Sequence, residues 1–265
     1  MDSNLNELNP LSRWPGWTYF GRPTDLDVRN VLEACISKVP HQTEFDFFRA
    51  FDADAGLFLD VGANMGLTSL SLWLTNPSVE VLSLEPLPFL NPVLTRVCQM
   101  LPNRRCLEIG AGSTFRKATM HVPVVDGLMC TTWSTLEPET ALAAKAAFWK
   151  QITGRDAIEV ETFEVQLMDL DRLDLEPRFL KMNLEANGLA ALSGMERTLE
   201  KASPILWLEH SSGSPAPEWL SARGYAPYHW SPAAGALQSW SPEMSFNIFY
   251  IKRIHEQDLL ARGVL

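Results

Sequence analysis

The chain lacks the features that mark membrane, secreted and nucleic-acid-binding proteins. It has no run of 18 apolar residues, so no transmembrane helix is expected. Its first residues, MDSNLNELNPLSRW, do not form a basic-then-apolar signal peptide. A formal net charge of −10 disfavours binding to nucleic acids and to anionic membrane surfaces. We therefore expect a cytoplasmic protein with neither kind of partner.

Metal-binding and nucleophile motifs are missing as well. The four cysteines show no CxxC spacing, which favours reduced, inert thiols. The five histidines are scattered without partners at ligand spacing, so no metal site is predicted. No Gly-x-Ser-x-Gly nucleophile elbow occurs.

The most informative stretch is FLDVGANMG, Phe58 to Gly66. Leu57, Phe58, Leu59 and Val61 are apolar, a run that is typical of a central parallel strand covered on both faces. Asp60 stands near the carboxyl end of that strand, where open α/β sheets bind their ligands. At 46% hydrophobic residues, the 265-residue chain can bury the core of such a domain.

The glycine turn narrows the choice of ligand. A dinucleotide fingerprint requires glycine at the places held by Gly62, Asn64 and Leu67, and it fails at two of them. Met65-Gly66-Leu67 does not provide the Gly-Lys-Ser/Thr of a phosphate-binding P-loop. The pattern that remains is Asp-x-Gly-x-Asn-x-Gly, and an NAD-dependent oxidoreductase is disfavoured.

An acidic residue ends the next predicted strand, Val79 to Leu84. Glu85 lies 25 residues after Asp60, where an acid can accept hydrogen bonds from ribose hydroxyls. The alternative is an acid that only caps a helix. The third predicted strand, Cys106 to Ile109, ends in Gly110-Ala111-Gly112, whose small residues leave room for an adenine ring.

A second informative stretch is FLKMNLEANGLAALSG, residues 179–194. Phe179, Lys181, Asn183 and Glu185 alternate with apolar residues over a predicted strand from Phe179 to Glu185. A buried polar array of this kind is costly unless it has partners, so it indicates a lined pocket. The strand from Pro204 to Glu209 ends at His210, which is either a base, an acceptor contact or a surface histidine.

Together, these motifs resemble the FkbM family of S-adenosylmethionine-dependent methyltransferases. DVGANMG is similar to the first motif of that family, and Glu85-Pro86 to its following acid. The second stretch matches the family pattern at Lys181, Glu185, Leu192 and Gly194. It departs from the pattern at Asn183, Ala186 and Gly188, where Asp, Gly and Glu are expected. The resemblance covers roughly residues 55–252.

The resemblance implies a Rossmann-like class I methyltransferase fold of the α/β class. We expect a mostly parallel seven-stranded sheet with an antiparallel last strand and helices on both faces. Residues 1–53 form an N-terminal helical extension, with helices over Asp25–Lys38 and Gln42–Phe51, whose aromatic side chains either pack on the core or form a lid. Residues 54–265 form the S-adenosylmethionine-binding domain.

An inserted β-hairpin and helix excursion interrupts this domain. Strands are predicted over Arg116–Val125 and Ala157–Met168, with the excursion, residues 126–156, between them. It contains a predicted helix over Pro138–Gln151 and is either an acceptor-binding flap or decoration.

The expected function is O-methylation of a hydroxyl on a small metabolite, such as a sugar unit or a natural product, with S-adenosyl-L-methionine as cofactor. Glu185 is the first candidate base and His210 the second, Asn183 orients the acceptor, and Lys181 pairs with Glu185. The expected acceptor contacts are Trp133 and Asn187. The expected cofactor contacts are Asp60, Gly62, Ala63, Asn64, Gly66, Glu85, Pro86, Gly110 and Ala111. A catalytically inactive binding protein with the same fold is the main alternative, and the sequence leaves homo-oligomer formation open.

Overall fold

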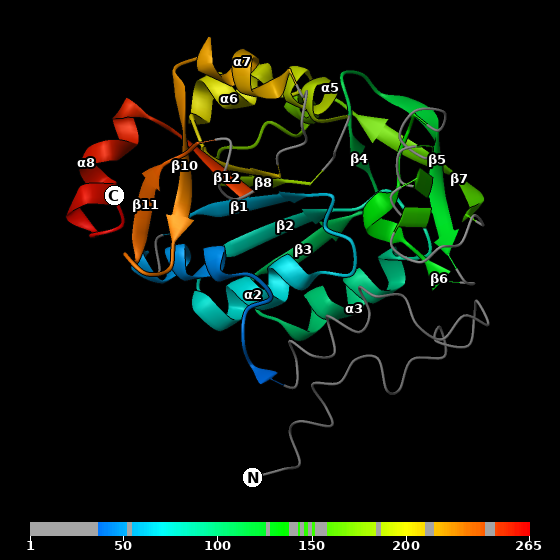
Figure 1. Cartoon of the computed structure of the whole chain (residues 1–265), viewed down its shortest axis with the longest axis horizontal. Helices are drawn as coiled ribbons and strands as arrows, with labels where there is room; N and C mark the ends of the chain where they lie inside the picture. Colours follow the sequence, from blue (N-terminus) through cyan, green and yellow to red (C-terminus); the bar gives the residue numbers. More distant parts are fainter. Residues whose placement is uncertain are drawn as a thin grey trace.

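The computed structural model arranges the chain as two β-sheets flanked by helices (Figure 1). It describes residues 37–51, 55–125, 128–137, 158–183, 187–209, 215–241 and 247–265, together with residues 143, 146, 147, 150 and 151. None of the helices in these ranges is both long and apolar enough to cross a membrane.

The main sheet has eight strands in the order β11-β10-β12-β9-β8-β1-β2-β3. The prediction of seven strands is therefore wrong, because a short edge strand, β11, pairs with β10 through a tight turn that ends at Gly235. The last strand, β12, runs antiparallel to both of its neighbours, as expected. The strands are β1 (Leu57–Val61), β2 (Glu80–Leu84), β3 (Arg104–Leu107), β8 (Pro177–Met182), β9 (Ile205–Glu209), β10 (Tyr225–Ser231), β11 (Ala236–Ser239) and β12 (Asn247–Lys252).

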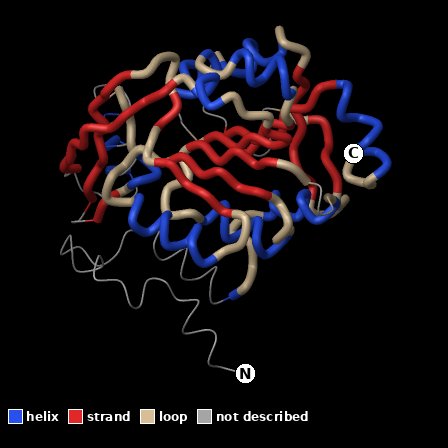
Figure 2. Tube along the Cα trace, turned by 180° about the vertical axis from the view of Figure 1, so that it is seen from behind, coloured by secondary structure: helices blue, strands red, loops and turns tan. Residues whose placement is uncertain are grey.

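Helices cover both faces of this sheet, as Figures 1 and 2 show from opposite sides. One face carries α5 (Gly188–Ser193), α6 (Glu196–Ala202) and α7 (Ala216–Ser221). The other carries α2 (Leu67–Thr75) and α3 (Asn91–Met100), and α8 (Arg253–Ala261) closes the end near β12. Because side chains alternate along each strand, the apolar residues divide into one core above the sheet and one below it.

The lower core is built around aromatic rings from the segment that precedes β1. The helix predicted over Gln42–Phe51 is a 3₁₀ helix, η2 (Thr43–Ala50). Phenylalanines three residues apart suit three residues per turn, since they align on one face. These rings pack against Phe58, Phe179, Trp207 and Phe249 of the sheet, so they serve packing. The helix predicted over Asp25–Lys38 lies, except for its last two residues, outside the described residues.

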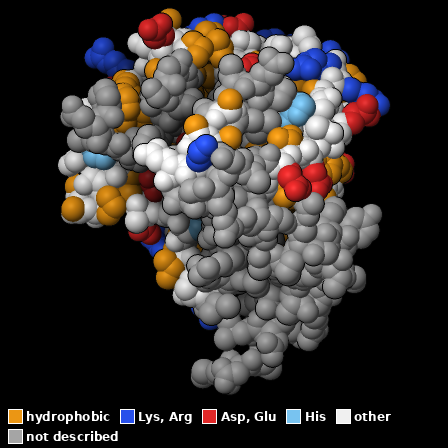
Figure 3. Space-filling view, turned by 45° about the vertical axis from the view of Figure 1, so that its right-hand side comes forward, with side chains coloured by type: hydrophobic (Ala, Val, Ile, Leu, Met, Phe, Trp, Pro, Cys, Tyr) orange, Lys and Arg blue, Asp and Glu red, His pale blue; other side chains and the backbone are white. Residues whose placement is uncertain are grey.

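The second sheet has the order β4-β7-β5-β6 and stands beside the main sheet. Its strands are β4 (Gly110–Ala111), β5 (Arg116–Val125), β6 (Leu128–Met129) and β7 (Ile158–Met168). The long β5–β7 pair confirms the two extended strands predicted around the excursion. Most of the helix predicted over Pro138–Gln151 lies outside the described residues. The described surface on this side mixes acidic, basic and hydrophobic side chains (Figure 3).

Strands β8 and β3 both end before their predicted last residues, for the same reason. Strand β8 ends at Met182 instead of Glu185, because its partner β1 ends at Val61 and the chain turns at Gly62. Strand β3 occupies Arg104–Leu107 instead of residues 106–109, because its pairing with β2 ends at Leu84. A strand extends only as far as its neighbour does.

Backbone atoms touch where the two sheets meet. A Cβ built on Gly194, which follows α5, would lie 1.9 Å from the carbonyl oxygen of Gly112, just beyond β4. The Gly194 carbonyl in turn accepts the N–H of Asp171, in η4 (Leu170–Leu173), at 3.0 Å. Position 194 is therefore glycine because a Cβ has no room there, and not because its backbone has a positive φ.

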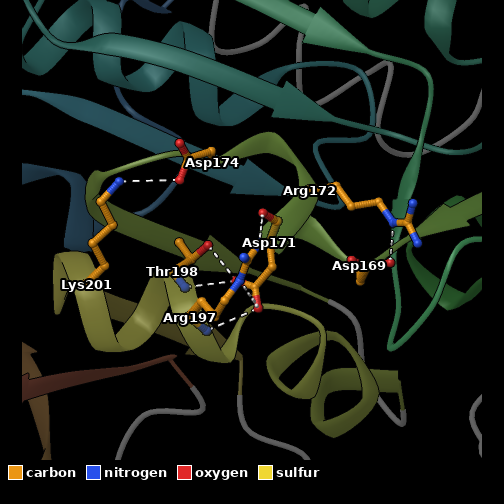
Figure 4. A network of polar contacts seen from close by, with 7 residues as sticks. All are labelled: Asp169, Asp171, Arg172, Asp174, Arg197, Thr198 and Lys201. Carbon is orange, nitrogen blue, oxygen red and sulfur yellow. Dashed lines mark hydrogen bonds and ion pairs between the residues drawn. The ribbon is translucent and has the colours of Figure 1, made fainter.

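Asp171 also holds the start of α6. Its carboxylate accepts the backbone N–H groups of Arg197 and Thr198 at 3.1 and 2.8 Å, and the Thr198 hydroxyl at 2.8 Å (Figure 4). The first N–H groups of a helix have no acceptor within the helix, so Asp171 caps α6 from outside it.

We predict that Gly194→Ala lowers the free energy of unfolding by about 2–3 kcal/mol, because the neighbour that must yield is backbone and not a flexible side chain. Gly188→Ala is the matched control, since a Cβ there has nothing within 4 Å and lies in a helix. It should be neutral or stabilising by up to about 1 kcal/mol. Urea unfolding checks both, and equal stability of the two variants would contradict the contact.

Candidate functional site

The turn after β1 is held in a left-handed backbone conformation. Gly62, Asn64 and Gly66 have φ angles of 79°, 51° and 91°. The Gly62 and Ala63 N–H groups both donate to the Leu84 carbonyl, at 2.9 and 3.0 Å. These bonds place the turn over the end of β2, beside Glu85.

Glu85 is fixed by this turn. It is 5% exposed, and its Oε2 accepts the Asn64 N–H at 2.8 Å while its Oε1 accepts the Leu87 N–H at 2.8 Å. The carboxylate therefore caps the turn and its own loop, not a helix.

A cavity of about 410 Å³ opens at the carboxyl ends of the central strands, within the usual range for small-molecule sites. It is bounded by the glycine turn, the second sheet and the segment before η2. Most of the site residues predicted from the sequence line this cavity: Gly62, Ala63, Asn64, Glu85, Pro86, Gly110, Ala111, Trp133, Lys181, Asn183 and Asn187.

Two predicted site residues do not line the cavity, and two others are not described. Asp60 is fully buried below the cavity, and Gly66 packs beside Leu94 and Val97, so neither lines it. Glu185 and His210, the candidate bases, lie outside the described residues.

The excursion reaches the glycine turn. The Asn64 side-chain amide donates to the Thr131 hydroxyl at 2.8 Å, and Thr131 begins η3 (Thr131–Trp133). Residues 131–137, which include Trp133, line the cavity. On another wall, the Asn187 amide donates to the Ala111 carbonyl at 3.0 Å. Elements far apart in sequence thus meet around one cavity.

Comparison with known proteins identifies the domain. The model of the methyltransferase FkbM domain matches residues 60–229, which is more than half of the chain. The chain belongs to the FkbM methyltransferase family. No curated protein matches it.

Two solved methyltransferase structures are similar to this FkbM-family chain. One is an FkbM methyltransferase from Methylobacillus flagellatus KT, with 16% identity, a TM-score of 0.48 and coverage of 89% of this chain. This chain spans 58% of the length of that protein. The other is a precorrin-6y C5,15-methyltransferase from Geobacter metallireducens GS-15, with 13% identity, a TM-score of 0.39 and coverage of 78% and 84% of the two chains.

In this FkbM domain, Lys181 of the cavity wall lies next to the buried Asp60. They are register neighbours on β1 and β8, and Lys181 Nζ lies 3.8 Å from Asp60 Oδ1, beyond hydrogen-bond length. Burial raises the pKa of Asp60, and the Lys181 charge acts in the opposite direction. Lys181 Nζ also lies 5.7 Å from the Trp207 ring.

His41 is a cavity residue that sequence reasoning missed. It lines the cavity from the segment before η2, and its Nδ1 lies 2.7 Å from the hydroxyl of Ser71 on α2. Burial, and secondarily the Lys181 charge, lower its pKa to about 3. No local pattern marks His41, since only the packing of the following phenylalanines brings its segment to the site.

Glu209 was missed for a different reason. It is the last residue of β9, as predicted, and it lines the cavity. Its place at the carboxyl end of a predicted strand, directly before His210, is the sequence signal that marks it. No group of three or more His, Cys, Asp or Glu side chains able to hold a metal occurs among the described residues.

We predict that His41 stays neutral from pH 5 to 8. Its folded pKa lies below the value of about 6.5 for the unfolded chain. The unfolded state therefore binds more protons between pH 3 and 6.5, and the contribution of His41 to stability is complete above pH 6.5 and declines as pH falls. NMR of ¹⁵N-labelled imidazoles, assigned with His41→Phe, checks this. A midpoint above pH 5 for His41 would contradict the buried geometry.

Proposed function

We propose that this chain is an S-adenosyl-L-methionine-dependent O-methyltransferase that acts on a hydroxyl of a small metabolite. The observation that carries the proposal is the setting of Glu85. A buried carboxylate, aligned by two backbone N–H groups beside a glycine turn, is prepared to accept the two hydroxyls of a ribose. The family match supports methyl transfer as the reaction class.

The residues at the cavity fit this cofactor. Gly62 has no Cβ, so a ligand can approach the backbone there. At the adenine end, a Cβ on Gly110 would lie 2.6 Å from Leu167 and 3.2 Å from Pro86, so a small residue keeps this wall close-packed. Bound S-adenosyl-L-methionine supplies an electrophilic methyl group on a sulfonium sulfur.

The rest of the chemistry belongs to the chain's own residues. Because methyl transfer is an in-line displacement, positioning of the acceptor contributes much of the rate. Asn183 lies beside Val61, to whose carbonyl its N–H donates at 3.2 Å, and it shares the cavity with Glu209. An asparagine cannot take a proton, so we assign Asn183 to orientation. Trp133 and the hydroxyl-bearing residues around it supply the acceptor wall.

A hydroxyl is a poor nucleophile until it loses its proton, so a base within hydrogen-bond reach contributes about 10²–10⁴ in rate. We keep Glu185 and His210 as the candidates, since each follows a strand that ends at the cavity. A small hydroxylated compound, such as a sugar unit or a natural product, is the acceptor class that we propose.

The cofactor assignment predicts the effect of Glu85→Gln. The change removes one charge-assisted acceptor, which is worth about 1.5–3 kcal/mol, so affinity for S-adenosyl-L-methionine should fall more than tenfold. Calorimetry measures it, with thermal unfolding as a folding check. Glu80→Gln, an exposed residue at the opposite end of β2 that pairs with Arg105, is the control and should bind normally. Binding of NAD, or unchanged affinity in Glu85→Gln, would refute the assignment.

The base assignment predicts the behaviour of Glu185→Gln and His210→Asn. With saturating cofactor and a panel of methyl glycosides as acceptors, formation of S-adenosylhomocysteine should fall about 10²-fold or more in one of the two variants, while cofactor affinity is kept. Full turnover in both would exclude both residues as the base. Cofactor binding without transfer to any glycoside or other hydroxylated compound tested would favour the inactive binding protein.

A further inference from the structure

Three groups of donors meet at the corner of the cavity that lies between α2, β8 and the segment before η2. They come from Lys181, from His41 and from the first turn of α2. Each has donors without an acceptor in the described part of the chain. We refer to this place as the donor corner.

Lys181 is the charged member of the donor corner. Its side chain is 12% exposed, and its ammonium makes no hydrogen bond to any described residue. The nearest carboxylate, Asp60, is 3.8 Å away. An ammonium this deeply buried is costly unless a ligand accepts its N–H groups.

His41 is the neutral member. The buried Ser71 hydroxyl accepts the His41 backbone N–H at 3.2 Å and lies 2.7 Å from Nδ1. Because this hydroxyl already accepts one bond, we assign its own proton to the bond with Nδ1, which places the imidazole proton on Nε2. Among the described residues, Nε2 has no partner, so it presents a donor at the cavity that His41 lines.

The first turn of α2 completes the corner. Leu67 and Thr68 line the cavity at the start of a nine-residue helix, whose first N–H groups have no acceptor within the helix. The positive end of the helix dipole favours a negative group there. Lys181, His41 and the first turn of α2 therefore all present donors to the same cavity.

We propose that the donor corner binds the carboxylate of the amino-acid half of S-adenosyl-L-methionine, with Lys181 and His41 as direct donors. The inference rests on the proposed function and deepens it. Glu85 and α2 lie at the two ends of one short turn, since Asn64, two residues before the N-cap Gly66, donates to Glu85. A ligand whose ribose meets Glu85 can therefore extend its other half toward the corner.

The test compares two ligands that differ in this half. S-adenosylhomocysteine carries the amino-acid moiety, and 5′-methylthioadenosine does not. By calorimetry on the whole chain, Lys181→Met and His41→Phe should each weaken S-adenosylhomocysteine about tenfold or more, and leave 5′-methylthioadenosine within about twofold. Lys181→Arg should recover part of the loss, because it keeps a charged donor. Lys201→Met and His229→Phe, changes at one exposed lysine and at a histidine of β10, should bind both ligands normally.

The outcomes separate the two proposals. If the wild-type chain binds neither ligand, the proposed cofactor is wrong and the corner loses its ligand with it. If the wild-type chain binds both ligands, and the variants either weaken the two ligands equally or weaken neither of them, the cofactor proposal stands and the donor corner is refuted. Retained binding of 5′-methylthioadenosine shows that each variant is folded. A change confined to the KM of the acceptor would place the negative group on the acceptor and would also refute the assignment.

Discussion

The bond from the Asn64 N–H to the Glu85 carboxylate is the interaction on which the site depends. It joins the end of β1 to the end of β2 across a turn whose residues adopt positive φ angles. The Asn64 side chain continues the link to Thr131, so the turn is also tied to the excursion. Asn64 thereby connects Glu85, the glycine turn and the Thr131 segment of the excursion. The donor of this bond is a backbone N–H, so among substitutions at position 64 only proline would remove it.

Much of the fold could be predicted because its signals are local. The apolar run of β1, the acid after β2 and the alternation along β8 are visible within a few residues, and they place Gly62, Glu85 and Lys181 at one edge of the sheet. Strand ends were less predictable, since pairing partners and not propensity decide them. The eighth strand was missed because β11 is only four residues long and owes its place to a hairpin with β10.

The part of the site that could not be predicted comes from long-range packing. His41 reaches the cavity only because phenylalanines after it fill the space below β8 and β9. Each of those rings contributes a large apolar surface, whereas His41 contributes one hydrogen bond to Ser71. The position of His41 is thus fixed by its apolar neighbours. A sequence pattern shows that those neighbours are buried, but it does not show which elements they pack against.

The contact between Gly112 and Gly194 has a consequence for the behaviour of the cavity on warming. Most contacts between elements involve side chains whose rotamer populations change with temperature. The distance between two elements that such contacts hold apart therefore changes with temperature as well. Here backbone meets backbone, and no rotatable bond lies between the two elements. The separation of β4 from the end of α5 should therefore stay constant until the domain unfolds. The end of the cavity next to Gly110 and Ala111 should then keep its dimensions as the temperature rises.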